Sequence, residues 1–228
     1  MRFGRRHQQP GSSTEPTQTA PEQVAPVVPR SETSLKKGQV VSLLKDDGSS
    51  LEGVRMGLGW DPAEGVSSID LDANCTAVDK KGNELFTVSF RQLQSACQSV
   101  RHTGDNLTGE GDGDDESILV DLPRLLQANR EIAALYFTVC SYRGQRFGVV
   151  ANASCHIVAT VNGRDAKDLG TFNLTDNGDD HTALIMARIV LWQSLWHAQM
   201  VGEKANGRVA SDLLGAIKEH LKANPVGA

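Results

Sequence analysis

The stretch SIDLDANCTAVD, residues 68–79, decides the predicted fold class of this chain. Apolar and polar side chains alternate along it, and a period of two residues is typical of a half-buried β-strand. One face consists of Leu71, Ala73, Cys75 and Ala77, and the other of Asp70, Asp72 and Asn74. The residues KKGN (80–83) then predict a hairpin turn into a second strand, ELFTVSF.

Further short apolar segments, separated by turn residues, continue this pattern on both sides. The segments expected to form strands are 39–44, 53–60, 117–122, 132–142, 155–161 and 168–174. Residues 184–201 permit either two strands with a turn near Gln193–Ser194 or one helix. Many short strands joined by Gly, Asn and Asp turns predict a mainly β fold, a two-sheet antiparallel β-sandwich.

Composition divides the chain into three regions. Residues 1–34 hold five of the eight prolines and few large apolar side chains, so we expect a disordered tail rich in Pro, Ser, Thr and Gln. Residues 35–205 would form the sandwich domain. Residues 206–228 would form a C-terminal helix and tail, because apolar residues recur there at helical spacing. These are Val209, Leu213, Leu214, Ile217 and Leu221.

Charge and cysteine content exclude several functional classes. The net charge is −5, and no basic stripe with interleaved aromatic residues occurs, so the sequence does not predict nucleic-acid binding. No run of eighteen apolar residues predicts a transmembrane segment. The N-terminus lacks the apolar core of a secretory signal. Four cysteines occur singly, which favours reduced thiols and a cytoplasmic location.

The sequence HTGDNLTGEGDGDDE, residues 102–116, contains six acidic residues and no lysine or arginine. It is either a solvated acidic run or a cation site. Strand-like segments tether both of its ends, and glycines lie between the acids, which permits positive φ angles around an ion. Carboxylate, amide and hydroxyl oxygens suit Ca²⁺ better than zinc or copper, and the flexible loop suits Ca²⁺ better than Mg²⁺.

The number of charges predicts about two cations. The six loop acids and the neighbouring Asp70 and Asp72 carry up to eight negative charges. Without a cation, such carboxylates repel one another or take up a proton, so we expect an empty loop to be mobile and a filled one to be ordered. The loop does not fit the EF-hand pattern, because position three of a register from Asp105 is Leu107.

Several motifs together carry a family resemblance. In order they are KKGQVVSLL (36–44), VRMGLGWD (54–61), IDLDA (69–73), the acidic stretch 102–116 and FGVVANA (147–153). They resemble the TerD family, the tellurium-resistance and general stress proteins of bacteria, over roughly residues 34–205. The resemblance implies a β-sandwich that binds calcium at one end. The ligands that it implies are Asp70, Asp72, Asp105, Asn106, Glu110, Asp112, Asp114, Asp115 and Glu116.

The resemblance also implies a function. The chain is expected to be a non-enzymatic, calcium-binding stress-response protein, a scaffold or sensor that acts with other stress proteins in an assembly near the membrane. It would be cytoplasmic or peripheral to the inner face of the membrane. Two alternatives stay open: a metal-dependent phosphoryl-transfer or hydrolytic enzyme, and a nucleotide or small-ligand sensor. His102 and Trp60 are interpreted as structural residues rather than catalytic or ligand-binding ones.

Overall fold

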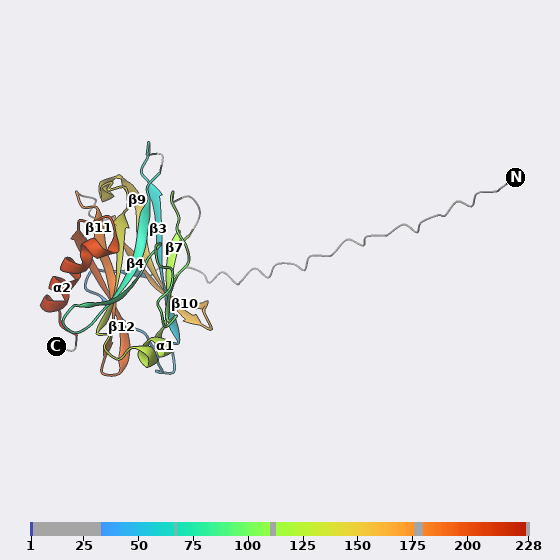
Figure 1. Cartoon of the computed structure of the whole chain (residues 1–228). Helices are drawn as coiled ribbons and strands as arrows, with labels where there is room; N and C mark the ends of the chain where they lie inside the picture. The colour runs from blue at the N-terminus through green and yellow to red at the C-terminus, as the bar shows by residue number, and fades with distance from the viewer. Residues whose placement is uncertain (2–32, 67, 110–112, 176–179, 227–228) are drawn as a thin grey trace.

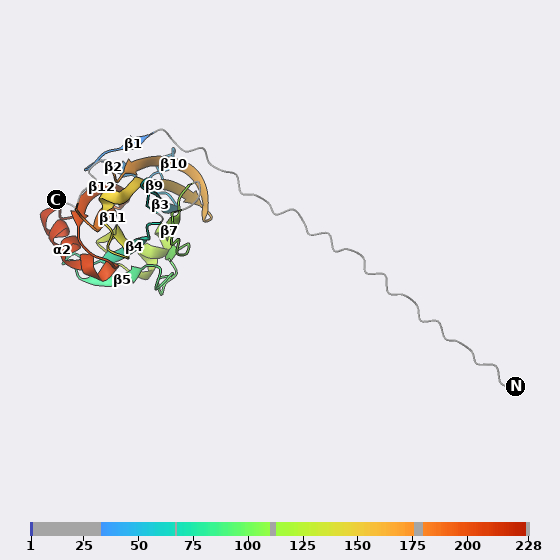
Figure 2. The same cartoon turned by 90° about the horizontal axis from the view of Figure 1, so that it is seen from above.

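Two six-stranded β-sheets face each other across one hydrophobic core (Figures 1 and 2). The computed structural model describes Met1 and residues 33–66, 68–109, 113–175 and 180–226. The predicted two-sheet sandwich is confirmed. The tail predicted for residues 1–34 lies almost entirely outside the described residues. Within the described segments, no helix combines the length and apolar character needed to cross a bilayer.

Each sheet brings together strands that are distant in the sequence. Sheet A contains, in spatial order, β1 (Ser34–Leu35), β10 (Arg164–Asn173), β9 (Val150–Val161), β3 (Gly53–Pro62), β7 (Glu116–Asp121) and β6 (Val100–His102). Sheet B contains β2 (Val40–Ser42), β12 (Leu195–Ala205), β11 (Ala183–Trp192), β8 (Ala134–Ser141), β4 (Leu71–Val78) and β5 (Glu84–Val88). Neighbouring strands are antiparallel except β1 and β10, which are parallel.

The segment that permitted two interpretations, residues 184–201, forms a hairpin of β11 and β12. Gln193 and Ser194 join the two strands with φ angles of 49° and 64°. Two consecutive positive φ angles are those of a type I′ turn, whose twist matches that of the flanking strands. The hairpin therefore forms although neither turn residue is glycine.

Strand β8 is buried along its whole length, because each face packs against a different partner. Its inner face contributes Leu135 and Phe137 to the core between the sheets. Its outer face contributes Tyr136 to a second apolar cluster under the C-terminal helix α2 (Leu214–Ala223). A short 3₁₀ helix, η2 (Ala210–Leu213), precedes α2. The predicted C-terminal helix is thus confirmed, and it covers the outside of sheet B (Figure 2).

Two short helices were not predicted from the sequence: α1 (Leu122–Ala128) and the 3₁₀ helix η1 (Phe147–Val149). The predicted strand 117–122 ends at Asp121, whose side chain accepts a hydrogen bond from the Arg124 N–H at 2.9 Å. This carboxylate caps α1, and Pro123 lies in its first turn, where a missing N–H costs nothing. The cap explains why the chain turns from strand to helix at this point.

The cluster under α2 generates a stability prediction. Ile217 is fully buried against sheet B, so Ile217→Ala should lower the free energy of unfolding by about 2–5 kcal/mol through lost burial and a cavity. The matched control is Glu219→Ala on the same helix, whose side chain is 74% exposed and should change stability little. Urea denaturation measures the free energy of unfolding of both variants. An equally small change in the two variants would show that the burial of Ile217 adds no stability to the sandwich.

Candidate metal centre

Three carboxylates from two parts of the chain form a cluster at one end of the sandwich. Asp70 immediately precedes β4, Asp72 lies on β4, and Asp105 lies in the loop between β6 and β7. One carboxylate oxygen from each lies within 4.8 Å of the other two. Asp70 and Asp72 are buried, at 4% and 2% exposure, whereas Asp105 is exposed. We call these three residues the carboxylate cluster.

The electrostatics of the carboxylate cluster are unfavourable for three bare anions. Burial raises the pKa of Asp72 to about 8, with further contributions from the negative charges of Glu116, Asp70 and Asp105. Burial also raises the pKa of Asp70, and the charge of Asp105 adds to this shift. Asp70 Oδ1 and Asp72 Oδ2 have no hydrogen-bond partner among the described residues. The cluster is therefore short of positive charge and of hydrogen-bond donors.

Glu116, the first residue of β7, is held beside the cluster by hydrogen bonds. Its Oε2 accepts the Ala73 N–H at 2.7 Å, and its Oε1 accepts the Asn106 N–H at 3.1 Å. The His102 Nε2 lies 3.1 Å from the Ala73 carbonyl oxygen and 3.3 Å from Glu116 Oε2. His102 Nδ1 accepts the Gly104 N–H at 3.1 Å, so the proton belongs on Nε2. These contacts fix the position of the His102 ring, and its interpretation as a structural residue stays a prediction.

Asn106 and Asp115 connect the two described ends of the acidic loop. The Asn106 side-chain amide donates to Asp115 Oδ1 at 2.9 Å, and Asp115 Oδ2 accepts the Trp60 N–H at 2.9 Å. Asn106 Oδ1 also accepts the N–H groups of Thr108 and Gly109 at 3.0 and 3.1 Å. These contacts order the described ends of the acidic loop against β3.

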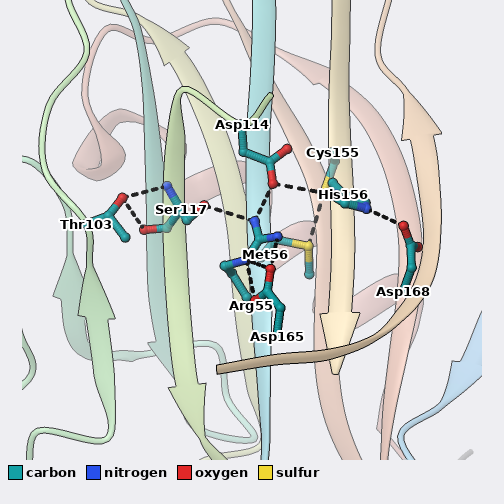
Figure 3. A network of polar contacts seen from close by, with 9 residues as sticks. All are labelled: Arg55, Met56, Thr103, Asp114, Ser117, Cys155, His156, Asp165 and Asp168. Atoms are coloured by element: carbon teal, nitrogen blue, oxygen red, sulfur yellow. Dashed lines mark hydrogen bonds and ion pairs between the residues drawn. The ribbon is translucent and has the colours of Figure 1, made fainter. Parts of the chain in front are cut away.

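Asp114 lies apart from the carboxylate cluster, on the outer face of sheet A. Its carboxylate contacts the Arg55 guanidinium and lies 3.2 Å from His156 Nδ1 (Figure 3). Burial alone would raise the pKa of Asp114, but hydrogen bonds and positive charge from His156 and Arg55 lower it. In turn, Arg55 Nη2 binds Asp165 at 2.7 Å, and His156 Nε2 lies 2.7 Å from Asp168. Asp114 therefore joins the loop to β3, β9 and β10.

Sequence reasoning assigned no role to four cationic residues near the loop acids. Arg55 and His156 hold Asp114, as described above. Arg143 Nε lies 3.7 Å from Asp70 Oδ2, and the charge of Arg91 lowers the pKa of Asp72 against the effect of burial. No spacing in the sequence identifies these residues, because each comes from a different strand or loop. Of the remaining predicted ligands, Glu110 and Asp112 lie outside the described residues.

The comparison with known proteins places the chain in a family. The model of the TerD domain matches residues 32–213, which includes both sheets and the acidic loop. The chain belongs to the TerD family. The resemblance found in the motifs is thereby confirmed, and the match continues past β12 into η2.

Relatives of this TerD chain include bacterial proteins named for tellurium resistance and for stress response. Tellurium resistance protein TerZ from Serratia marcescens is 43% identical over 190 residues, covering 79% of this chain and 94% of TerZ. Stress response protein SCP2 from Bacillus subtilis is 36% identical, covering 79% and 96%. A crystal structure of a homologue of the telluride resistance protein (TerD) from Streptomyces coelicolor superposes with a TM-score of 0.60 at 20% identity, covering 72% and 96%. The last likeness supports the fold alone.

The residues at the carboxylate cluster of this TerD chain fit a hard divalent cation. All of its ligand atoms are carboxylate oxygens, which Ca²⁺ and Mg²⁺ prefer. Two carboxylate oxygens of these residues, Asp70 Oδ1 and Asp72 Oδ2, are buried and without a donor among the described residues, although buried polar atoms are normally satisfied. A bound cation would provide the positive charge and coordination that these oxygens lack. Asp70, Asp72 and Asp105 are the residues that would hold it.

The raised pKa of Asp72 generates a pH prediction for the chelated protein. Between its ordinary value of 3.8 and about 8, the folded chain holds a proton on Asp72 that the unfolded chain has lost. Raising the pH through this window should therefore lower the free energy of unfolding, by up to about 1.4 kcal/mol per pH unit. Urea denaturation with EGTA from pH 5 to 8 measures the slope. Asp72→Asn should flatten it, and an unchanged slope in this variant contradicts the assignment.

The contacts of Asp114 generate a second prediction. Arg55→Met keeps much of the side-chain length but removes the cation that binds Asp165 and leaves Asp114 with His156 alone, which should destabilise the protein by about 3 kcal/mol. Arg164→Met removes the same charge from an exposed position beside the β9–β10 turn and should be nearly neutral. Thermal unfolding at constant pH compares the two, and similar midpoints would show that the Arg55 network contributes no stability.

Proposed function

We propose that this chain is a calcium-binding stress-response protein that acts in resistance to tellurite or related chemical stress. Its relatives TerZ and SCP2 carry names for tellurium resistance and stress response, and each matches most of this chain. The observation that supports calcium binding is the carboxylate cluster, with its two buried and unpartnered oxygens. The loop acids and glycines beside it favour Ca²⁺ over Mg²⁺, because Ca²⁺ accepts a larger and less regular oxygen shell.

The proposed site contains about two ions. Asp70, Asp72 and Asp105 would hold one ion, with Glu116 close enough for its charge to act on Asp72. Asn106 and Asp115 are paired with each other and lie in the same loop, so they are the described candidates for a further ion. Glu110, Asp112 and Asp114 remain predicted ligands. For Asp114, coordination would have to compete with Arg55 and His156.

The proposed role is non-enzymatic. A scaffold or sensor needs a stable fold whose surface or stability depends on the ion. Both candidate ion sites join the acidic loop to a strand, so ion binding there would act on the stability of the sandwich. We further propose a cytoplasmic location, with other stress-response proteins as partners in an assembly at the inner face of the membrane. No nucleic-acid partner is proposed, because the charge of the chain is acidic overall.

Calorimetric titration tests the calcium proposal. Ca²⁺ should bind saturably to the chelator-treated protein at about two ions per chain, and more tightly than Mg²⁺. At a free Ca²⁺ concentration one hundred times the dissociation constant, one site should raise the free energy of unfolding by about 2.7 kcal/mol. Failure to detect saturable binding would overturn the proposal.

Two variants locate the site. Asp72→Asn should weaken Ca²⁺ binding about tenfold or more, because it replaces a charged oxygen ligand of the cluster. Glu131→Gln removes one negative charge at an exposed position outside the acidic loop and should leave binding unchanged. Equal losses in both variants would indicate general electrostatic attraction rather than coordination by the cluster.

A further inference from the structure

A second concave site lies on sheet A, away from the acidic loop. It is a pocket of about 480 Å³, a size typical of small-molecule sites. Leu119 and Val120 of β7 and Pro123 of α1 form apolar parts of its wall. Its polar lining comes from several elements and consists of Glu52, Gln94, Gln98, Ser99, Arg101, Asp121, Arg124, Thr160 and Asn162. An apolar surface with several converging polar groups is the usual composition of a ligand site.

One polar group in this pocket is buried and lacks a partner. The Thr160 side chain is only 3% exposed, and its hydroxyl forms no side-chain hydrogen bond with any residue in the described part of the chain. Gly53 makes room for it, because a Cβ at Gly53 would lie 2.5 Å from Thr160 Oγ1 and 2.8 Å from the Val120 carbonyl oxygen. A hydroxyl held in a pocket wall without a protein partner is available to a ligand.

The charges of the pocket are arranged to receive an anion. Glu52 is bound by Lys45 Nζ at 2.8 Å, and Asp121 is engaged in capping α1. The guanidinium groups of Arg101 and Arg124 have no ion-pair partner among the described residues. With Lys45 counted, the three basic and two acidic side chains at the pocket sum to a charge of +1.

We propose that this pocket binds a small organic anion that carries a phosphate or carboxylate group and neighbouring hydroxyl groups. Arg101 and Arg124 would bind the anionic group, since guanidinium donors match carboxylate and phosphate oxygens. Thr160, Gln94, Gln98 and Asn162 provide hydrogen-bonding groups for the ligand hydroxyls. The chain thus has a ligand site in addition to its carboxylate cluster.

This site is independent of the proposed metal centre. Both sites contact strand β3, at different residues. Gly53 lines the pocket, whereas Leu58 pairs with Glu116 at the acidic loop. These two residues of β3 are about 17 Å apart along an extended strand. No residue of the carboxylate cluster lines the pocket. Ligand binding there should therefore occur with or without Ca²⁺.

Isothermal titration of the full chain tests the proposal. The probes are glycerol 3-phosphate and citrate, with glycerol as the uncharged control, each titrated in EGTA and again in Ca²⁺. Saturable binding of glycerol 3-phosphate or citrate, but not of glycerol, is the expected result, and the bound probe shows whether phosphate or carboxylate is recognised. If neither anion binds saturably, the proposal is wrong, whatever the result for calcium.

Substitutions then assign the binding to the pocket. Arg101→Gln and Arg124→Gln should each weaken binding of the anion about tenfold. Arg130→Gln removes the same charge from an exposed residue just beyond α1 and should have no effect. Thr160→Val preserves the shape of the buried side chain and should weaken binding about threefold or more. Unchanged affinity in Thr160→Val and in both pocket arginine variants would place the anion elsewhere and overturn the proposal.

Discussion

The carboxylate of Glu116 connects the two sheets at the end of the sandwich where the acidic loop lies. Glu116 begins β7 in sheet A, and the Ala73 N–H that it accepts belongs to β4 in sheet B. Its other oxygen accepts the Asn106 N–H of the loop. Because Glu116 is only 1% exposed, water cannot replace these bonds. The position of the loop relative to β4 therefore depends on one buried anion.

The negative charge of Glu116 also makes ionisation of the neighbouring carboxylates less favourable. Asp72 immediately precedes Ala73, so the hydrogen bond that connects the sheets also brings a negative charge close to Asp72. Burial and like charge together disfavour the ionised form of Asp72. Positive charge can come from Arg143 and Arg91 only at the edge, because both side chains are exposed. A proton or a cation is the remaining means of balancing the cluster, and a hard divalent cation can balance more than one carboxylate at once.

The strand pattern and the family motifs could be predicted from the sequence, because each depends on residues that are close together along the chain. Alternation in residues 68–79 predicted β4, the turn at 80–83 predicted the β4–β5 hairpin, and apolar spacing predicted α2. Asp70, Asp72 and Asp105 were among the nine ligands that the family resemblance implied, and the structure brings these three together. The family resemblance supplied the connection between the IDLDA motif and the acidic loop.

The pairing of strands that are distant in the sequence could not be predicted in this way. β3 lies between β7 and β9, whose residues are far along the chain, and no local pattern specifies these neighbours. The contacts of Asp114 depend on this arrangement, because Arg55 comes from β3 and His156 from β9. From the sequence alone, Asp114 cannot be distinguished from the other acids of the loop. Its separate role follows from the order of strands in sheet A.

The described ends of the loop make several contacts with the rest of the protein. Asp114 is bound to sheet A, Asp115 accepts the Trp60 N–H, and the Asn106 side-chain amide donates to Asp115 Oδ1. The expectation that an empty loop is mobile and a filled one ordered stays a prediction. A ligand set that is already positioned loses less conformational entropy when it binds. If the fold positions the ligands of the loop in this way, the loop would bind its ion more tightly. Ion binding would then mainly stabilise the contact between β4 and β7.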